Sequence, residues 1–114
     1  MLRTYLKARV VGLTITESEP GAAPGLALDS EVLAAAQIMP GERVRVSVHG
    51  GPACECHASP ARRGSGTVRL TGFAGAPAGA SLTVATECLL VDREALTHEP
   101  REVRVGPGNR LVDE

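Results

Sequence analysis

The clearest pattern in the chain is the alternation of polar and apolar residues over 43–48, which read RVRVSV. Because successive side chains of a strand point to opposite faces, this alternation predicts a strand with one buried and one exposed face. Residues 4–16 also favour β structure, with a change of phase near Gly12. The stretch 82–91 is the most apolar in the chain and predicts another strand, and 102–105 predicts the last one.

Shorter elements separated by turns fill the rest of the chain. Two short helices are predicted, one over 31–36 with Asp29 or Ser30 as its N-cap, and one over 92–96 capped by Asp92. Many short strands joined by turns predict a mainly β fold, a small closed or nearly closed barrel with one or two short helices. The remaining elements expected are strands over 26–28, 53–59 and 67–70, turns over 40–42, 49–52 and 62–66, and loops over 17–25 and 71–80.

The composition indicates one domain with an aliphatic core. A chain of 114 residues is long enough for one domain, 1–114, and short for two. Hydrophobic residues make up 43% of the chain but aromatic residues only 2%. Valine, leucine, alanine and isoleucine must therefore fill the core.

The charge pattern excludes several classes of partner. The net charge is −1 and both signs are spread evenly, so no block of charge predicts binding to nucleic acid or to a membrane. Bases would also find almost no aromatic side chains on which to stack. No apolar run approaches the ~18 residues that span a bilayer, and the mixed N-terminus is unlike a signal peptide. We therefore expect a cytoplasmic protein whose three cysteines stay reduced.

Several segments are similar, in their order and spacing, to one known family. They are MLRTYLK at 1–7, LALD at 26–29, AAQI at 35–38, RGS at 63–65, TGFAG at 71–75 and DREALTHEP at 92–100. Taken in this order over nearly the whole chain, they resemble the aspartate 1-decarboxylase family. The resemblance implies a double-psi β-barrel. It also implies a homo-oligomer, a tetramer with active sites between subunits.

The resemblance fails at the residues that build that family's cofactor. The family makes a pyruvoyl group from its own backbone by cleaving a Gly-Ser bond. Its serine falls here on Gly25, and the glycine before it falls on Pro24. Because glycine has no side-chain oxygen to attack the preceding carbonyl, Pro24 and Gly25 form a degenerate processing site. We expect no pyruvoyl group and no other cofactor.

The other active-site positions of the family are also replaced. The lysine that holds a substrate carboxylate falls on Arg9, which keeps a cation but changes a point charge into a planar fork. The arginine that grips the substrate falls on Ala53 or Cys54, depending on the placement of one gap. The family's tyrosine, threonine, second tyrosine and asparagine fall on Ala22, Cys56, His57 and Thr71. The resemblance thus assigns catalytic positions to His57, Cys56 and Thr71, and substrate-binding positions to Arg9, Cys54, Gly72 and Phe73.

The run Cys54-Glu55-Cys56-His57 is the new chemical cluster in the chain. On a strand, the two cysteines share one face and Glu55 and His57 share the other, so a direct Cys56–His57 dyad is geometrically poor. Three interpretations stay open: acid–base or thiol chemistry, a metal site, or small buried residues beside a surface histidine. The metal site would need Cys88, His49 or His98, and one residue between the cysteines is closer than the usual zinc spacing of about two to four. We expect no metal.

Two hypotheses about function follow. In the first, the chain is a repurposed enzyme of specialised bacterial metabolism that binds a small carboxylate or amino-acid-derived ligand through Arg9. Such an enzyme should gather Arg9, Cys56, His57 and Thr71 within about 8 Å around a concave pocket. In the second, the chain is a non-catalytic pseudoenzyme or a module that binds a ligand or a partner. Orthodox β-alanine production is the least favoured alternative, because the serine is missing.

Overall fold

The structure is a computed structural model that describes residues 1–49, 51 and 53–112. Its strands form one nine-stranded sheet, and the described chain also holds two short helices and one 3-10 turn, η1. The elements are β1 (Leu2–Thr14), β2 (Glu17–Glu19), β3 (Gly25–Asp29), α1 (Ser30–Ala36), β4 (Arg43–Val48), β5 (Ala53–Ala61), β6 (Val68–Thr71), β7 (Ser81–Val91), α2 (Asp92–Ala95), β8 (Arg101–Gly106), η1 (Pro107–Asn109) and β9 (Arg110–Leu111).

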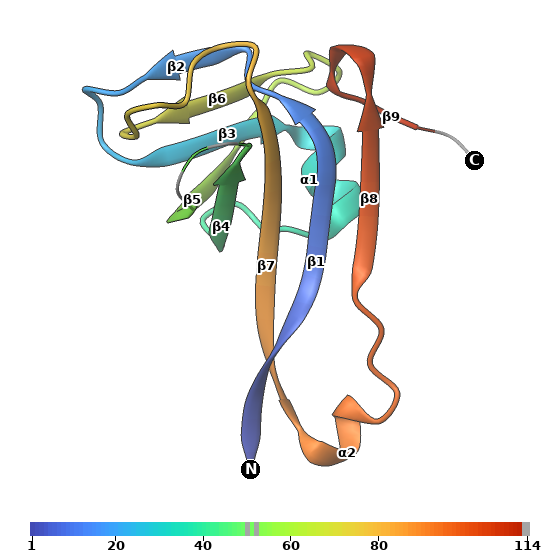
Figure 1. Ribbon diagram of the computed structural model, residues 1–114. Coiled ribbons are helices and arrows are strands. Elements are labelled where there is room, and N and C mark those ends of the chain that lie inside the picture. Colours follow the sequence, from blue (N-terminus) through green and yellow to red (C-terminus); the bar gives the residue numbers. More distant parts are fainter. Residues whose placement is uncertain (50, 52, 113–114) are drawn as a thin grey trace.

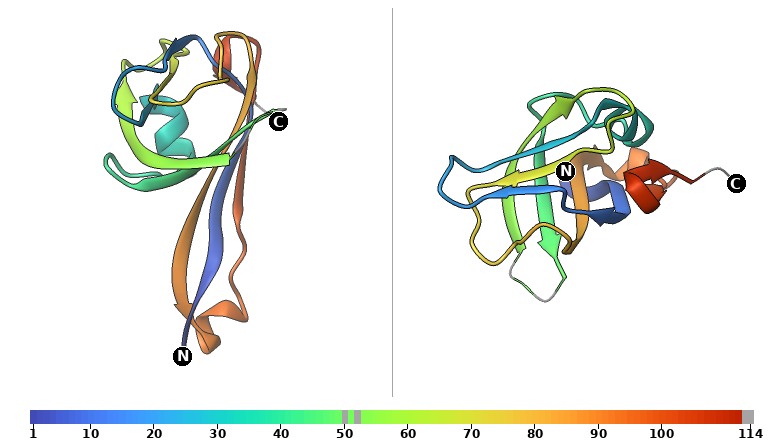
Figure 2. Two further views of the ribbon diagram at one scale, coloured as in Figure 1. Left: turned by 60° about the vertical axis from the view of Figure 1, so that its left-hand side comes forward. Right: turned by 90° about the horizontal axis from the view of Figure 1, so that it is seen from above.

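The sheet closes on itself because β1, near one end of the strand order, runs directly into β2 at the other end. The strand order is β2-β6-β3-β5-β4-β7-β1-β8-β9, and the edge strand β2 is the direct continuation of β1. At the junction, the amide of Thr16 donates to the carbonyl oxygen of Val68 at 2.8 Å. Seen from above, the strands curve round the core (Figure 2, right). The closed, mainly β fold with two short helices confirms the expected double-psi β-barrel.

The core is aliphatic, as the composition predicted. In β4, Val44, Val46 and Val48 are buried and the residues between them are exposed, which confirms the amphipathic strand expected from its alternation. The change of phase in β1 is confirmed as well, because its register with β7 shifts between Val10 and Leu13. The largest fully buried side chains are Leu13, Ile15, Leu26, Leu28, Leu70, Leu82, Val10, Val32, Val44, Val46, Val68 and Val84.

A two-stranded arm projects from the barrel. It consists of residues 2–6 of β1 paired with residues 87–91 of β7, and α2 lies at its far end (Figure 1; Figure 2, left). Its apolar side chains are largely unburied, with Leu2 59%, Leu89 62% and Leu96 86% exposed. Isolated two-stranded ribbons are only marginally stable in water. We therefore expect the arm to gain more stability than the barrel from any surface that covers its apolar side chains.

A buried carboxylate fixes the start of α1. Asp29, only 3% exposed, accepts hydrogen bonds from the backbone N–H groups of Glu31 and Gly64, both at 2.9 Å, and of Gly66 at 3.0 Å. Burial acts to raise the pKa of Asp29, but these donors and the charge of Arg110 lower it overall. Asp29 is thus both the N-cap of α1 and the anchor of the 62–66 turn.

A buried amide continues this network on the other side of Gly66. Asn109 accepts from the backbone N–H of Thr14 at 2.7 Å and donates to the carbonyl oxygen of Gly66 at 2.8 Å. Gly66 adopts a φ of +68°, and a Cβ there would lie 2.3 Å from the carbonyl oxygen of Gly108. We call Asp29, Gly64, Gly66 and Asn109 the Asp29 cluster.

Several sequence predictions need correction. The N-cap of α2 is Val91 rather than Asp92, because Glu94 reaches back to accept from the amide of Val91 at 3.0 Å. The predicted loop over 17–25 contains β2, which pairs with β6 in parallel. The strand predicted over 102–105 is not the last one, because β9 follows β8 and pairs back onto it. The turn predicted over 49–52 includes residues 50 and 52, which lie outside the described residues.

One further expectation concerned membranes. Within the described parts of the chain, no helix is long and apolar enough to span a bilayer, since α1 has seven residues and α2 has four.

Candidate functional site

The alternation of β5 places the cysteines and the histidine on opposite faces of the barrel. Cys56 is buried at 5% exposure and Cys54 is half-buried, whereas Glu55 and His57 point outward and are exposed. β5 lies between β3 and β4, and His57 pairs directly with Arg43. As the pleat predicted, Cys56 and His57 of one copy form no direct dyad.

An open pocket of about 440 Å³ brings the degenerate processing site next to β5. It is lined by Pro24, Arg43, Glu55, Cys56 and His57. Arg43 forms an ion pair with Glu55, which fixes the wall beside the exposed imidazole of His57. We call this the His57 pocket. It joins three segments that lie far apart in the sequence, namely the 20–24 loop, β4 and β5.

A second, smaller pocket contains three of the expected substrate-binding residues. Cys54, Gly72 and Phe73 line a pocket of about 190 Å³, together with Val48, Ala74, Gly75 and Ala76. This lining is mainly apolar. It suits a small apolar group better than a charged one, because few polar atoms would compensate an ion for lost hydration.

The loop before β3 is held by the residues that follow β6. The hydroxyl of Thr71 donates to the carbonyl oxygen of Ala23 at 2.6 Å, with that of Gly25 at 3.4 Å. Gly72 has a φ of +81°, and a Cβ there would lie 2.5 Å from the Cα of Pro24. Only glycine allows this close approach. In this arrangement Thr71 and Gly72 position Pro24 and Gly25, and the Thr71 hydroxyl is engaged by the loop.

The two thiols of β5 hold their protons more tightly than a free cysteine does. Burial, followed by the neighbouring Cys54, raises the pKa of Cys56 to about 11, and burial also raises the pKa of Cys54. A thiol is a weak nucleophile and a poor metal ligand until it loses its proton. The buried side of β5 therefore contributes packing rather than a reactive thiolate.

The expected partners for a metal site lie elsewhere. Cys88 is on β7, separated from β5 by β4, and pairs with Tyr5 in the arm. His98 lies against the arm, where its Nε2 is 2.7 Å from the carbonyl oxygen of Leu6. Among residues 1–49, 51 and 53–112, no three histidine, cysteine or acidic side chains gather closely enough to hold a metal ion.

Arg9 is not brought to the His57 pocket within one copy of the chain. It is exposed on β1 and pairs with Ala85 of β7, which pairs with Arg45 of β4, which in turn pairs with Glu55 of β5. Three strand spacings of about 4.8 Å place Arg9 roughly 14 Å from β5. The expected gathering of Arg9 around His57 therefore needs a second copy of the chain.

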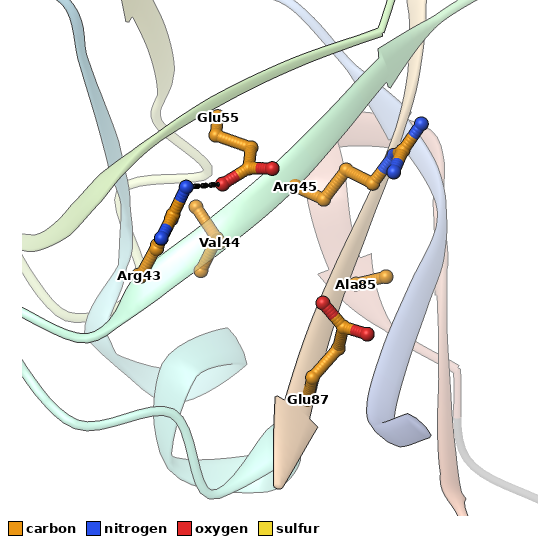
Figure 3. A pocket seen from close by; sticks show the side chains of 6 residues that line it. All are labelled: Arg43, Val44, Arg45, Glu55, Ala85 and Glu87. Carbon is orange, nitrogen blue, oxygen red and sulfur yellow. Dashed lines mark ion pairs between the residues drawn. The ribbon is translucent and has the colours of Figure 1, made fainter. Parts of the chain in front are cut away.

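The outer face of the sheet holds a hollow that sequence reasoning missed. This hollow, about 210 Å³ in volume, is lined by Arg43, Val44, Arg45, Glu55, Ala85 and Glu87 (Figure 3). It shares Arg43 and Glu55 with the His57 pocket, so the two adjoin, and we call them together the outer groove. The alternation of β4 could have indicated that Arg43 and Arg45 lie on the exposed face. Their alignment with Ala85 depends on strand register, which the sequence does not reveal.

Comparisons with known proteins agree over nearly the entire chain. The family model described as aspartate decarboxylase matches residues 1–112. The chain is 32% identical to the aspartate 1-decarboxylase of Caldicellulosiruptor saccharolyticus, over 98% of this chain and 90% of that protein. It is also 32% identical to the enzyme of the same name from Methylibium petroleiphilum, over 97% and 95% of the two chains. For the Desulfitobacterium hafniense protein the identity is 31%, over 98% and 91%.

Proposed function

Since the chain belongs to the aspartate decarboxylase family, we propose that it is a repurposed member acting on a small carboxylate or amino-acid-derived substrate without a pyruvoyl group. The observation that carries this proposal is the His57 pocket. It presents an exposed imidazole beside Pro24, next to a residue, Gly25, that offers no side-chain hydroxyl.

The residues around Gly25 do not fit the pyruvoyl group on which the family depends. A pyruvoyl group is made from a serine, whose Oγ attacks the preceding carbonyl. Position 25 lacks even a Cβ, and one placed there would lie 3.3 Å from the Oγ1 of Thr71. Proline at 24 and the hydrogen bond from Thr71 to the carbonyl oxygen of Ala23 restrict the loop. We derive no chemical step through a pyruvoyl group.

In the proposed mechanism His57 is the group that accepts and returns a proton at the substrate. Imidazole titrates near neutral pH, which suits a general acid or base. The ion pair of Arg43 with Glu55 forms part of the wall of the pocket, which Cys56 also lines. Thr71 acts by positioning the loop at Pro24. Cys54, Gly72 and Phe73 form the neighbouring apolar subsite.

We also propose that the active protein is a cytoplasmic homo-oligomer, a tetramer, with sites completed between subunits. The exposed leucines of the arm support an interface, because contiguous exposed apolar surface marks association sites. The distance of Arg9 from His57 within one copy supports shared sites. A reducing compartment fits Cys54, Cys56 and Cys88, which are all free.

A ligand-binding protein without catalysis is the second candidate. It is supported by the high pKa of Cys56, which removes a thiolate nucleophile from the pocket, and by the engagement of the Thr71 hydroxyl with the loop. Both candidates share the outer groove as the ligand site. They differ in whether His57 moves a proton.

Intact-mass spectrometry tests the absence of processing. We expect a single species at the full-chain mass of 11.8 kDa that gains no mass from phenylhydrazine, which reacts with carbonyl groups. Two fragments separated between Pro24 and Gly25 would overturn the proposal. A matched Pro24→Gly, Gly25→Ser variant restores the Gly-Ser pair and is expected to stay intact, because Cys56 and His57 are retained. Its cleavage would show that these two residues alone separate the chain from a self-processing protein.

Subunit complementation tests the shared site. Small carboxylates and amino acids are first screened for turnover by NMR. For any substrate found, Arg9→Gln and His57→Ala should each abolish activity, and unfolding and refolding the two variants together should restore part of it. Restoration requires that the two residues of one site come from different copies. Failure to restore activity in a mixed oligomer contradicts the intersubunit site, and an active His57→Ala variant contradicts the role of His57.

A further inference from the structure

We infer that Arg45 is a second anion-binding residue, which shares with Arg9 a site over Ala85 that takes the carboxylate or phosphate group of a small ligand. The inference extends the proposed function, on which it rests for the role of Arg9. The residue it adds, Arg45, lies outside the set expected from the sequence.

The strand register brings the two arginines to either side of a small residue. Ala85 of β7 pairs with Arg9 of β1 on one side and with Arg45 of β4 on the other. Residues in register point to the same face, and both arginines are exposed on the outer one. The two Cα atoms therefore lie about 10 Å apart. Ala85 has only a methyl group for a side chain and lines the hollow together with Arg45.

Within the described residues, neither arginine is neutralised by an acid. No carboxylate oxygen lies within 4.0 Å of the side-chain nitrogens of Arg9 or Arg45, whereas the neighbouring Arg43 is paired with Glu55. Figure 3 shows the same difference. The side chain of Arg43 turns toward Glu55, and that of Arg45 extends from β4 across to β7.

Acidic residues on the same face limit what the site accepts. Glu102 pairs with Arg9 on β8, and Glu55 pairs with Arg45 on β5, so the row ends in a carboxylate on each side. Glu87 lies along β7 beside Ala85 and lines the hollow (Figure 3). A ligand is therefore expected to place its anionic group between the arginines and to keep negative charge away from Glu87.

The chemistry of guanidinium favours an oxyanion over a halide. Each planar fork donates two parallel N–H···O bonds to a carboxylate or a phosphate. Two forks on opposite sides of one small residue provide a specific geometry in addition to charge.

Calorimetric titration of the full chain at low ionic strength tests the inference, with succinate and inorganic phosphate as separate probes. Arg45→Gln should weaken binding of the preferred probe about tenfold or more, the loss of one charge-assisted pair of hydrogen bonds. Ala85→Leu should weaken it similarly by filling the space without changing charge. Glu87→Gln should strengthen it. Arg62→Gln, an exposed arginine in the 62–66 turn, is the control with the same change in charge.

Each result decides the question. Loss of binding in Arg45→Gln and Ala85→Leu with full binding in Arg62→Gln supports the site, and the tighter probe identifies its ligand as carboxylate or phosphate. Binding of neither probe, unchanged binding in Arg45→Gln, or equal loss in Arg62→Gln overturns it. Ala85→Leu and Arg45→Gln lie on different strands, so a folding defect in one leaves the other informative.

The inference and the proposed function can fail separately. If the probe binds in a way that depends on Arg45 but no substrate is turned over, the proposed reaction is contradicted and the anion site is not. Turnover that depends on Arg9 and His57 but is indifferent to Arg45→Gln would contradict the second anion-binding residue alone.

Discussion

The Asp29 cluster and the outer groove use polar residues in opposite ways. In the Asp29 cluster, each carboxylate oxygen of a buried side chain accepts from backbone N–H groups of the same chain. In the outer groove, Arg45, Glu87 and His57 are exposed, whereas Arg43 is paired with Glu55. Polar groups that are satisfied internally hold the fold. Those held outward without a partner are available to a ligand.

Burial explains this difference. A charged group removed from water costs free energy unless hydrogen bonds replace its hydration, so Asp29 exists inside the barrel only with its three donors. An exposed group has water as a partner and needs none from the protein. The variants below test this division, in order of their expected effect on the free energy of unfolding.

Asp29→Ala is expected to have the largest effect. It removes the N-cap of α1 and leaves the amides of Gly64 and Gly66, the second of them buried, without their acceptor, so the free energy of unfolding should fall by roughly 3 kcal/mol. Urea denaturation followed by circular dichroism measures the change. Asp92→Ala is the matched control, because Asp92 is exposed and only pairs with Arg3 at 3.6 Å. Its effect should stay within about 0.5 kcal/mol, and an equal loss in both variants would break the comparison.

The pH dependence of the unfolding free energy provides a second test of how much the charged Asp29 stabilises the fold. Its pKa in the folded protein is lowered, so the folded state binds its proton less readily than the unfolded state. The resulting stabilisation is fully present above the unfolded pKa of about 3.9 and is lost as the pH falls through the lower folded value. The wild type should therefore lose its advantage over Asp29→Asn below about pH 4. A difference in unfolding free energy that stays constant from pH 7 to pH 3 would contradict this.

Gly72→Ala is expected to have the next largest effect, at the boundary between the core and the site. The new Cβ would meet the Cα of Pro24 at 2.5 Å and would also have to adopt a φ of +81°, for a cost of roughly 2 kcal/mol or more. Gly79→Ala separates the two causes. Gly79 has a φ of +92° but no atom within 4 Å of its Cβ position, so only the backbone strain of about 1 kcal/mol applies. Displacement of Pro24 should also speed the labelling of Cys56 by thiol reagents in Gly72→Ala alone.

The features that the sequence predicted correctly are those that depend on local contacts. The alternation over 43–48 is enough by itself to predict a strand with one buried face. Asp29 caps α1 by accepting a hydrogen bond from the amide of Glu31, two residues away. The prediction of Asp92 as the N-cap of α2 was wrong for a local reason too, because the carboxylate of Glu94 accepts from the amide of Val91 and the helix starts after Val91. The contacts of Asp29 with Gly64 and Gly66 could not be predicted, because they join segments more than thirty residues apart.

The sequence suggested which residues to consider for the candidate site, but not how the strands arrange them in space. The pleat of β5 correctly separated Cys56 from His57, and resemblance pointed to Pro24 and Thr71. Strand order decides the rest, because it places Arg9 three strands from β5 and puts Arg45 in register with Ala85. The buried environment of Cys56, which raises its pKa, likewise follows from packing against β4 rather than from its neighbours in sequence.

His57→Gln is expected to have the smallest effect on stability. His57 is exposed, and within the described residues its ring makes no hydrogen bond, so the free energy of unfolding should change by under about 0.5 kcal/mol. Cys56→Ser on the same strand is the control. It buries a hydroxyl in a site formed for sulfur and should cost about 1–3 kcal/mol. Urea denaturation of both variants, with turnover of any substrate found, measures the two effects. If His57→Gln were as destabilised as Cys56→Ser, His57 would be a structural residue. Both faces of β5 would then stabilise the fold, as the Asp29 cluster does, and His57 would not be held for a ligand.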